Sequence, residues 1–136
     1  MSERKTDYGQ LEIGYDFPPA SYQLDSSTVA NYLRAVGETS NLYQDLEIVP
    51  PIAVAALAMA ALSERMTLPA GAIHVSQELE FLSIVKTKDT ITSYARVTRN
   101  QKRGKLHFLT IGLNACNNKQ EAVLAGETSF ILPEQD

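Results

Sequence analysis

The stretch that decides the fold is PPIAVAALAMAAL, residues 50–62, in which two prolines precede eleven consecutive apolar residues. Proline is tolerated in the first turn of a helix, where its missing N–H would have no acceptor within the helix. A helix that is apolar on every side has to be covered by protein. The run is also far shorter than the roughly 20 residues that span a bilayer. The stretch therefore predicts a fully buried central helix.

The sequence after this helix reads as strands. AIHVSQELEFL, residues 72–82, alternates in a way that predicts a half-buried antiparallel strand. Its predicted buried face contains Ile73, Val75, Leu79 and Phe81, and its predicted outer face contains His74, Ser76, Glu78 and Glu80. Three further strand-like runs cover residues 90–99, 105–116 and 121–132, and the connectors NQKRG and NNKQ have hairpin length. Together these runs predict a four-stranded antiparallel meander.

Two elements are predicted before the central helix. QLEIGYDF, residues 10–17, alternates like a short strand that Pro18 and Pro19 then stop. A helix is predicted within residues 24–38, because apolar residues recur at helical spacing at Val29, Tyr32, Leu33 and Val36. Its start can be capped by Asp25, Ser26 or Ser27, and Gly37 suits a left-handed stop.

The order of these elements predicts the fold class. A single all-apolar helix and one alternating sheet pack together if the sheet curls around the helix. We therefore expect an α+β protein with the hotdog fold, in which an antiparallel sheet of about five strands wraps around a long apolar central helix. Length and composition are those of one domain, residues 1–136.

Composition limits the classes of function. A net charge of -4 without a basic patch argues against nucleic-acid binding. The single cysteine, Cys116, and an N-terminus without a signal-peptide pattern are typical of a cytoplasmic protein. His74 and His107 lack metal-ligand spacing, and no nucleotide-binding motif occurs, so we expect neither a metal nor a cofactor.

Several stretches resemble the MaoC-like hotdog family of (R)-specific enoyl-CoA hydratases and acyl dehydratases. They are VANYLRAVGETSNLYQD, PPIAVAALAMAAL, GAIHVSQELEFLSIVKTKDTI and RGKLHFLTIGLNACNNKQEAVLAGETSFILP. The second and third are particularly similar to the non-catalytic-type halves of fatty-acid-synthase-like dehydratases. The resemblance implies a protein that binds an acyl-CoA or acyl-carrier thioester and is nominally a 2-enoyl-CoA hydratase or 3-hydroxyacyl dehydratase.

Active members of that family carry a loop G-D-x-N-P-[LIV]-H, whose aspartate and histidine activate water. On this pattern Gly37 matches the glycine, but Glu38 stands at the aspartate and Tyr43 at the histidine. Asn41 falls at the proline position of the pattern. If the register is shifted by one residue, it matches the family asparagine instead. Tyrosine, with a reference pKa of about 10, is a poor general base at neutral pH. From the local sequence alone, the stretch can also be read as a capped turn in which the Tyr43 side chain covers the open end of the hydrophobic core.

The resemblance also implies the remaining site residues. The family's oxyanion donor is a backbone amide near the start of the central helix, which places Pro51, Ile52 and Ala53 at the substrate. Gln77, the polar member of a predicted apolar face, either lines a substrate tunnel or satisfies helix-end carbonyls. His74 could replace the missing histidine, but its predicted outward face favours a solvated or interface position.

Three functions and two kinds of assembly stay open at this level. The chain is an altered hydratase or dehydratase, or a non-catalytic subunit of a heteromeric dehydratase, or a hotdog thioesterase. The thioesterase reading is disfavoured because the central helix has no carboxylate before Glu64. A small hotdog sheet leaves edges that a partner can cover, so we expect a homodimer or a heterodimer with a second MaoC-like chain. The basic hairpin at Arg99, Lys102, Arg103 and Lys105 either meets carrier phosphates or is simply exposed.

Overall fold

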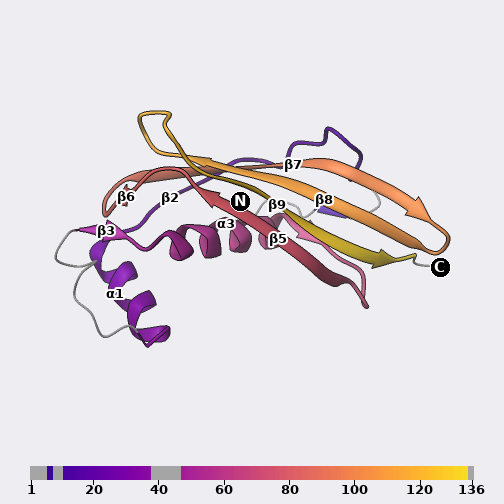
Figure 1. Ribbon diagram of the computed structural model, residues 1–136, viewed down its shortest axis with the longest axis horizontal. Coiled ribbons are helices and arrows are strands. Elements are labelled where there is room, and N and C mark those ends of the chain that lie inside the picture. Colours follow the sequence, from indigo (N-terminus) through magenta and orange to yellow (C-terminus); the bar gives the residue numbers. More distant parts are fainter. Residues whose placement is uncertain (1–5, 8–10, 38–46, 135–136) are drawn as a thin grey trace.

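The computed structural model describes residues 6–7, 11–37 and 47–134, which form one curled sheet beside a long helix (Figure 1). The helices are α1 (Ser26–Ala35) and α3 (Pro51–Arg65). The long strands are β2 (Ala20–Gln23), β5 (Ile73–Phe81), β7 (Thr90–Arg103), β8 (Leu106–Cys116) and β9 (Ala122–Pro133). Four two-residue strands are β1 (Thr6–Asp7), β3 (Ile48–Val49), β4 (Met66–Thr67) and β6 (Val85–Lys86).

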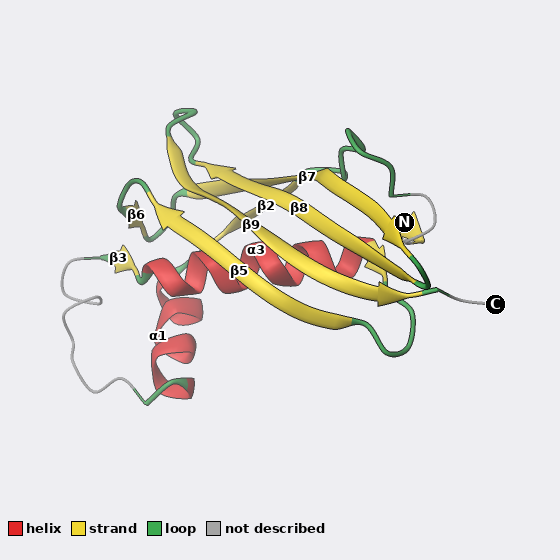
Figure 2. Ribbon diagram, turned by 45° about the vertical axis from the view of Figure 1, so that its right-hand side comes forward, coloured by secondary structure: helices red, strands yellow, loops and turns green. Residues whose placement is uncertain are grey.

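The five long strands form one antiparallel sheet in the order β2-β7-β8-β9-β5, and α3 lies along its concave side (Figure 2). This arrangement confirms the α+β hotdog prediction. The predicted four-stranded meander is wrong in one respect, because β5 lies beside β9 and not beside β7. Between β5 and β7 the chain passes through β6, which pairs with β3 just before α3.

The core lies between the sheet and one side of α3. Ala53, Val54, Ala58 and Leu62 of α3 are each less than 5% exposed. They pack in the same clusters as the buried residues of the central strands, including Ile91, Val97, Leu109, Ile111 and Leu124. The prediction that α3 is fully buried is wrong, because Ile52, Ala56 and Ala60 form an exposed stripe, with Ile52 56% exposed. One five-stranded sheet covers only the side of the helix that it faces.

The boundaries of α1 agree with the sequence. The Thr28 N–H donates to the Asp25 carboxylate at 2.8 Å, which caps the helix and lowers the pKa of Asp25 below its ordinary value. Val29 and Leu33 are buried as predicted, whereas Val36 is exposed. Gly37 ends the helix at φ +76°, a backbone conformation that favours glycine.

The predicted strand at residues 10–17 is wrong within its described part, residues 11–17. Gly14 has φ +92°, and the Tyr15 N–H donates to the Glu12 carbonyl at 3.0 Å, so the chain turns where the alternation predicted extension. Leu11 is buried while Ile13 is 67% exposed. Regular strand structure begins after the prolines, at β2.

The predicted faces of β5 are also wrong, for two reasons. The strand is a sheet edge, so Ile73, Val75 and Phe81 are exposed. In addition, the register with β9 shifts between His74 and Ser76, because Val75 is an extra residue in a β-bulge. A bulge reverses the alternation, and His74 therefore lies on the same face as Leu79, toward α3, rather than opposite to it.

Gly126 explains how β5 and β9 approach so closely. A Cβ atom at this position would overlap the Glu78 carbonyl oxygen and lie 2.9 Å from the Leu79 Cα atom. At Gly112, one strand further in, the nearest atom would be the end of the Thr98 side chain at 3.2 Å. The backbone of β5 cannot move aside as a side-chain methyl can.

We therefore predict that Gly126→Ala lowers the free energy of unfolding by about 1–3 kcal/mol, the usual cost of forcing extra atoms into a packed site. The matched variant Gly112→Ala should lose less, because a side chain can adjust. Urea unfolding followed by circular dichroism measures both values. Equal losses for the two variants would contradict the close backbone contact at Gly126.

Candidate functional site

The first turn of α3 is the part of the expected site that the structure describes best. Pro50 and Pro51 occupy the N-cap and first helical positions, as the sequence predicted. The Ala53 N–H donates to the Pro50 carbonyl at 2.9 Å, so this amide already has an acceptor. Helix geometry gives the Ile52 N–H no acceptor in its own helix. Of the two amides proposed as oxyanion donors, Ile52 is therefore the better placed, at the positive end of the helix dipole.

Of the altered catalytic loop, the described residues include only Gly37. Glu38, Asn41 and Tyr43 lie outside the described residues. Gly37 follows the C-cap of α1. That end of α1 points away from α3 in both views, whereas β3 leads directly into Pro50 (Figure 1, Figure 2). The structure therefore does not bring Gly37 next to Ile52 and Ala53.

An apolar pocket of about 150 Å³ lies on the β9 side of the C-terminal half of α3. Its lining residues are Met59, Leu62, Ser63, Met66, Leu68 and Phe130. No charged side chain lines it, and Ser63 supplies the only hydroxyl among these residues. This volume lies below the usual range for small-molecule sites, about 300–1,000 Å³. The apolar lining is compatible with a hydrocarbon chain that lies along α3. Sequence reasoning did not identify this pocket, because its lining combines residues 59–68 with Phe130, which lies far away in the sequence.

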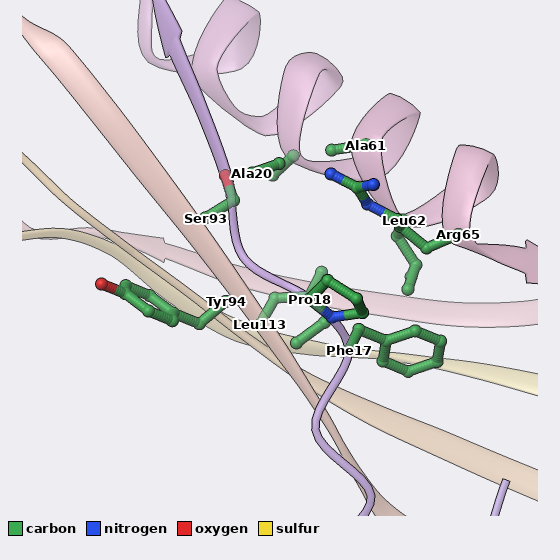
Figure 3. Close-up of a pocket in the computed structure, with 11 residues that line it drawn as sticks. Phe17, Pro18, Ala20, Ala61, Leu62, Arg65, Ser93, Tyr94 and Leu113 are labelled. Carbon is green, nitrogen blue, oxygen red and sulfur yellow. The ribbon is translucent and has the colours of Figure 1, made fainter. Parts of the chain in front are cut away.

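A second and smaller pocket, of about 20 Å³, lies on the opposite side of α3, between the helix and strands β2 and β7 (Figure 3). Leu62 lines both pockets and so forms a wall between them. The second pocket has a more polar character, since Arg65 extends along the helix toward Ala20 and Ser93 (Figure 3). The Ser93 hydroxyl is hydrogen-bonded to the Tyr22 hydroxyl at 2.8 Å, and burial raises the pKa of Tyr22. A charged guanidinium makes this side less suitable for a hydrocarbon tail.

His74 lies near the first pocket and not near the start of α3. Its Nε2 atom is 2.7 Å from the Thr128 hydroxyl oxygen, and its ring stacks on Phe130 at 4.9 Å between centroids. Phe130 lines the pocket together with Met66, which follows α3. From Ile52 to Met66 the helix rises about 21 Å at 1.5 Å per residue. His74 of the same chain is therefore too far from the first turn to replace the missing histidine there.

The other candidates are placed as follows. Gln77 lies opposite Thr128 in the register of β5 and β9, and it is exposed.

In the basic hairpin, the Lys102 ammonium pairs with Glu134 at 2.8 Å. Arg99 and Arg103 both lie over the Phe108 ring at 5.7 Å. The β7–β8 turn lies at the opposite end of the molecule from the start of α3 (Figure 1). These contacts favour the simple exposed hairpin over a phosphate site for a thioester bound at Ile52.

Among residues 6–7, 11–37 and 47–134, no three metal-ligating side chains come together. In the same part of the chain, neither helix has the length and apolar character required to cross a membrane.

The curled antiparallel sheet holding an apolar helix defines the hotdog class. Within that class, the chain belongs to the family described as FAS1-like, dehydratase domain region, whose profile matches residues 12–126. The resemblance to MaoC-like dehydratases and (R)-hydratases is thereby confirmed. No curated protein matches the sequence.

Solved structures agree on the fold. The R-hydratase PhaJ1 from Pseudomonas aeruginosa has a TM-score of 0.77 and 20% identity, over 94% of this chain and 86% of that one. A MaoC-like dehydratase from Rhodospirillum rubrum has a TM-score of 0.76 and 14% identity, over 95% and 97%. The HadBC (3R-hydroxyacyl-ACP dehydratase) complex from Mycobacterium tuberculosis contains a chain with a TM-score of 0.68 and 18% identity, over 88% and 96%.

The contact between His74 and Thr128 can be tested by a double-mutant cycle. Thr128 is fully buried, and Thr128→Val keeps its shape while removing the hydroxyl. His74→Phe keeps an aromatic ring against Phe130 and removes the nitrogen. We predict a coupling of about 0.5–1.5 kcal/mol, the usual net value of one hydrogen bond. Additive losses in urea unfolding would show that the two side chains do not interact in solution.

Proposed function

We propose that this chain binds an acyl thioester, with the acyl chain in the pocket between α3 and β9 and the thioester carbonyl near the Ile52 N–H. The observation that carries this proposal is the uncharged pocket lined by Met59, Met66 and Phe130, because it lies along the helix whose N-terminus offers the oxyanion donor. The membership in a dehydratase family supports the same ligand class. The thioester would belong to coenzyme A or to an acyl carrier protein.

The proposed nominal reaction is hydration of a 2-enoyl thioester or its reverse, the dehydration of a 3-hydroxyacyl thioester. In the hydration direction, the hydroxyl of water adds to C3 and a proton adds to C2. This chemistry needs a base for the water and an acid for C2, and suitable groups contribute roughly 10²–10⁴-fold. Glu38 and Tyr43 stand at the family positions for these roles, and Glu38 is the only one of the two that can act as a base near neutral pH. Neither a metal nor a cofactor enters this scheme.

A second candidate function is that of a non-catalytic subunit, which forms part of a substrate site while another chain supplies the Asp-His pair. The replacement of histidine by Tyr43 favours it, because a tyrosine donates a hydrogen bond well but accepts a proton poorly at neutral pH. A chain of the heteromeric HadBC complex is among the similar structures. The two candidates share the thioester site and differ only in where the acid-base groups come from.

Thioester hydrolysis, the third reading from the sequence, finds less support. Glu64 provides the first carboxylate on α3. It lines an open groove with Tyr22 and Arg65 on the β2 side of the helix, away from the uncharged pocket.

A cytoplasmic location stays a prediction that rests on the single cysteine.

The first test of activity uses the loss of enoyl absorbance from crotonyl-CoA and longer 2-enoyl-CoAs. If the altered loop works, Glu38→Gln should lower kcat/KM by roughly 10²-fold or more, since it removes the proposed base. Tyr43→Phe should cause a smaller loss, because it removes only a hydrogen-bond donor. Turnover that is unchanged in both variants would contradict their assignment. No turnover in a folded chain that still binds the thioester would select the non-catalytic subunit.

The pocket itself is tested by filling it. Ser63→Phe places a ring in the uncharged pocket, about 16 Å along α3 from Ile52. It should therefore weaken binding of thioesters with about 14 or more acyl carbons by roughly 10-fold or more, with little effect on crotonyl-CoA. Ala60→Phe, also at an exposed position of α3, fills the groove on the opposite side and is the matched control. Titration calorimetry with a non-reactive saturated acyl-CoA measures both. A chain-length effect of Ala60→Phe equal to that of Ser63→Phe would refute the proposed pocket.

A further inference from the structure

A groove on the β2 side of α3 is separate from the proposed thioester site. It runs between β2 and the helix residues Leu57, Ala60 and Ala61, and its volume is about 310 Å³. This volume falls within the usual range for small-molecule sites, about 300–1,000 Å³. The small pocket next to Ser93 adjoins the groove, because Ala61 and Arg65 line both. Groove and pocket together therefore have the shape of an elongated body with a narrow end.

We infer that this groove is a second ligand site, which takes a free carboxylic acid with an apolar body. The carboxylate lies at the narrow end, against Arg65 and Ser93, and the body lies along the groove. Leu62 forms the wall between this side of α3 and the pocket proposed for the acyl thioester. The inference therefore goes beyond the proposed function and does not rest on thioester chemistry.

Arg65 supplies positive charge at the narrow end of the site. Among the described residues that line the small pocket, Arg65 alone carries a charge, and its guanidinium extends along the helix toward Ser93 (Figure 3). A guanidinium has five N–H donors and no acceptor. The narrow end is thus suited to an anion and unsuited to a cation or a hydrocarbon tail.

Two hydroxyl groups add a further donor at the same end. Ser93 is only 8% exposed, and its hydroxyl oxygen lies 2.8 Å from the Tyr22 hydroxyl oxygen. One hydrogen bond between two hydroxyls uses only one of their two hydrogens, so the pair can donate the second to a ligand. Burial raises the pKa of Tyr22, which keeps the phenol protonated at neutral pH.

The size and donor geometry of the narrow end favour a carboxylate over other anions. A guanidinium presents parallel N–H groups that match the two oxygens of a planar carboxylate. The small pocket, at about 20 Å³, holds roughly one water-sized group. A carboxylate needs to place one oxygen there, whereas a phosphate has three further oxygens around its phosphorus. The pocket is therefore a closer fit for the planar group.

The walls of the adjoining groove are suited to an apolar body. Leu57, Ala60 and Ala61 contribute apolar side chains from the helix, and Pro19 and Ala20 contribute them from the chain at the start of β2. The alanines are short, so they leave space between the helix and the strand. Hydrocarbon placed in this space is removed from water, which stabilises it at about 25 cal/mol per Å².

Glu64 is the one acidic residue that lines the groove, and it bears on the same assignment. It is exposed and does not line the small pocket, so it lies on the solvent side of the groove. Salt and water screen the charge of an exposed carboxylate. Glu64 therefore opposes an anion at Arg65 only weakly.

Titration calorimetry with octanoate tests this site. We expect saturable binding at one site per chain, which Arg65→Gln weakens by roughly 10-fold or more because it removes a charged hydrogen-bond donor. Octanamide has the same length and no charge, so it should bind the unaltered chain roughly 10-fold more weakly than octanoate does. Circular dichroism checks that each variant is folded.

Two filling variants separate this site from the thioester pocket. Ala60→Phe fills the groove and should weaken octanoate binding by roughly 10-fold or more, while binding of a long saturated acyl-CoA is unchanged. Ser63→Phe fills the pocket on the β9 side and should leave octanoate binding unchanged. A thioester site that fails its own test would leave the octanoate result standing, so the two proposals fail separately.

Three outcomes would overturn the inference. The first is a folded chain that binds no octanoate at millimolar concentration. The second is octanoate binding that survives both Arg65→Gln and Ala60→Phe. The third is octanoate binding that is lost in Ser63→Phe and kept in Ala60→Phe, since this result would place octanoate in the thioester pocket.

Discussion

The structure depends on the packing of one side of α3 against the concave side of the sheet. Ala53, Ala58 and Leu62 face the strands, and the small alanine side chains let the sheet come close to the helix axis. Burial of apolar surface stabilises this contact at about 25 cal/mol per Å². Every other element is placed by it: β3 and β6 close one end of the sheet, and α1 is attached beyond them (Figure 1).

The same packing leaves two surfaces incomplete. A single curled sheet reaches one side of the helix, so the stripe at Ile52 remains exposed, and the sheet ends at β5 without a further strand among the described residues. The close approach that Gly126 permits holds β5 against β9 over its whole length. The bulge at Val75 turns His74 inward against Phe130. Pocket, bulge and edge thus belong to one region of the protein.

Much of the fold could be predicted because local patterns were strong. The cap at Asp25, the stop at Gly37 and the prolines before α3 act within a few residues of the chain, and the structure shows each of them. The candidate site was predicted less well. His74 was assigned to the wrong face because a bulge depends on the register with β9, which lies more than fifty residues away. The pocket at Met59 and Phe130 carries no motif at all, since ordinary apolar residues form it only after α3 and β9 have packed together.

The sequence by itself determined the class of the fold, the central helix and the departure from the Asp-His pattern at Glu38 and Tyr43, because these are properties of neighbouring residues. The tertiary structure alone decided which side of the helix is uncharged and which strands form the edges of the sheet. These features depend on contacts between distant segments. The place of β5 is the clearest case, because this strand pairs with β9 and not with β7, the next long strand along the chain.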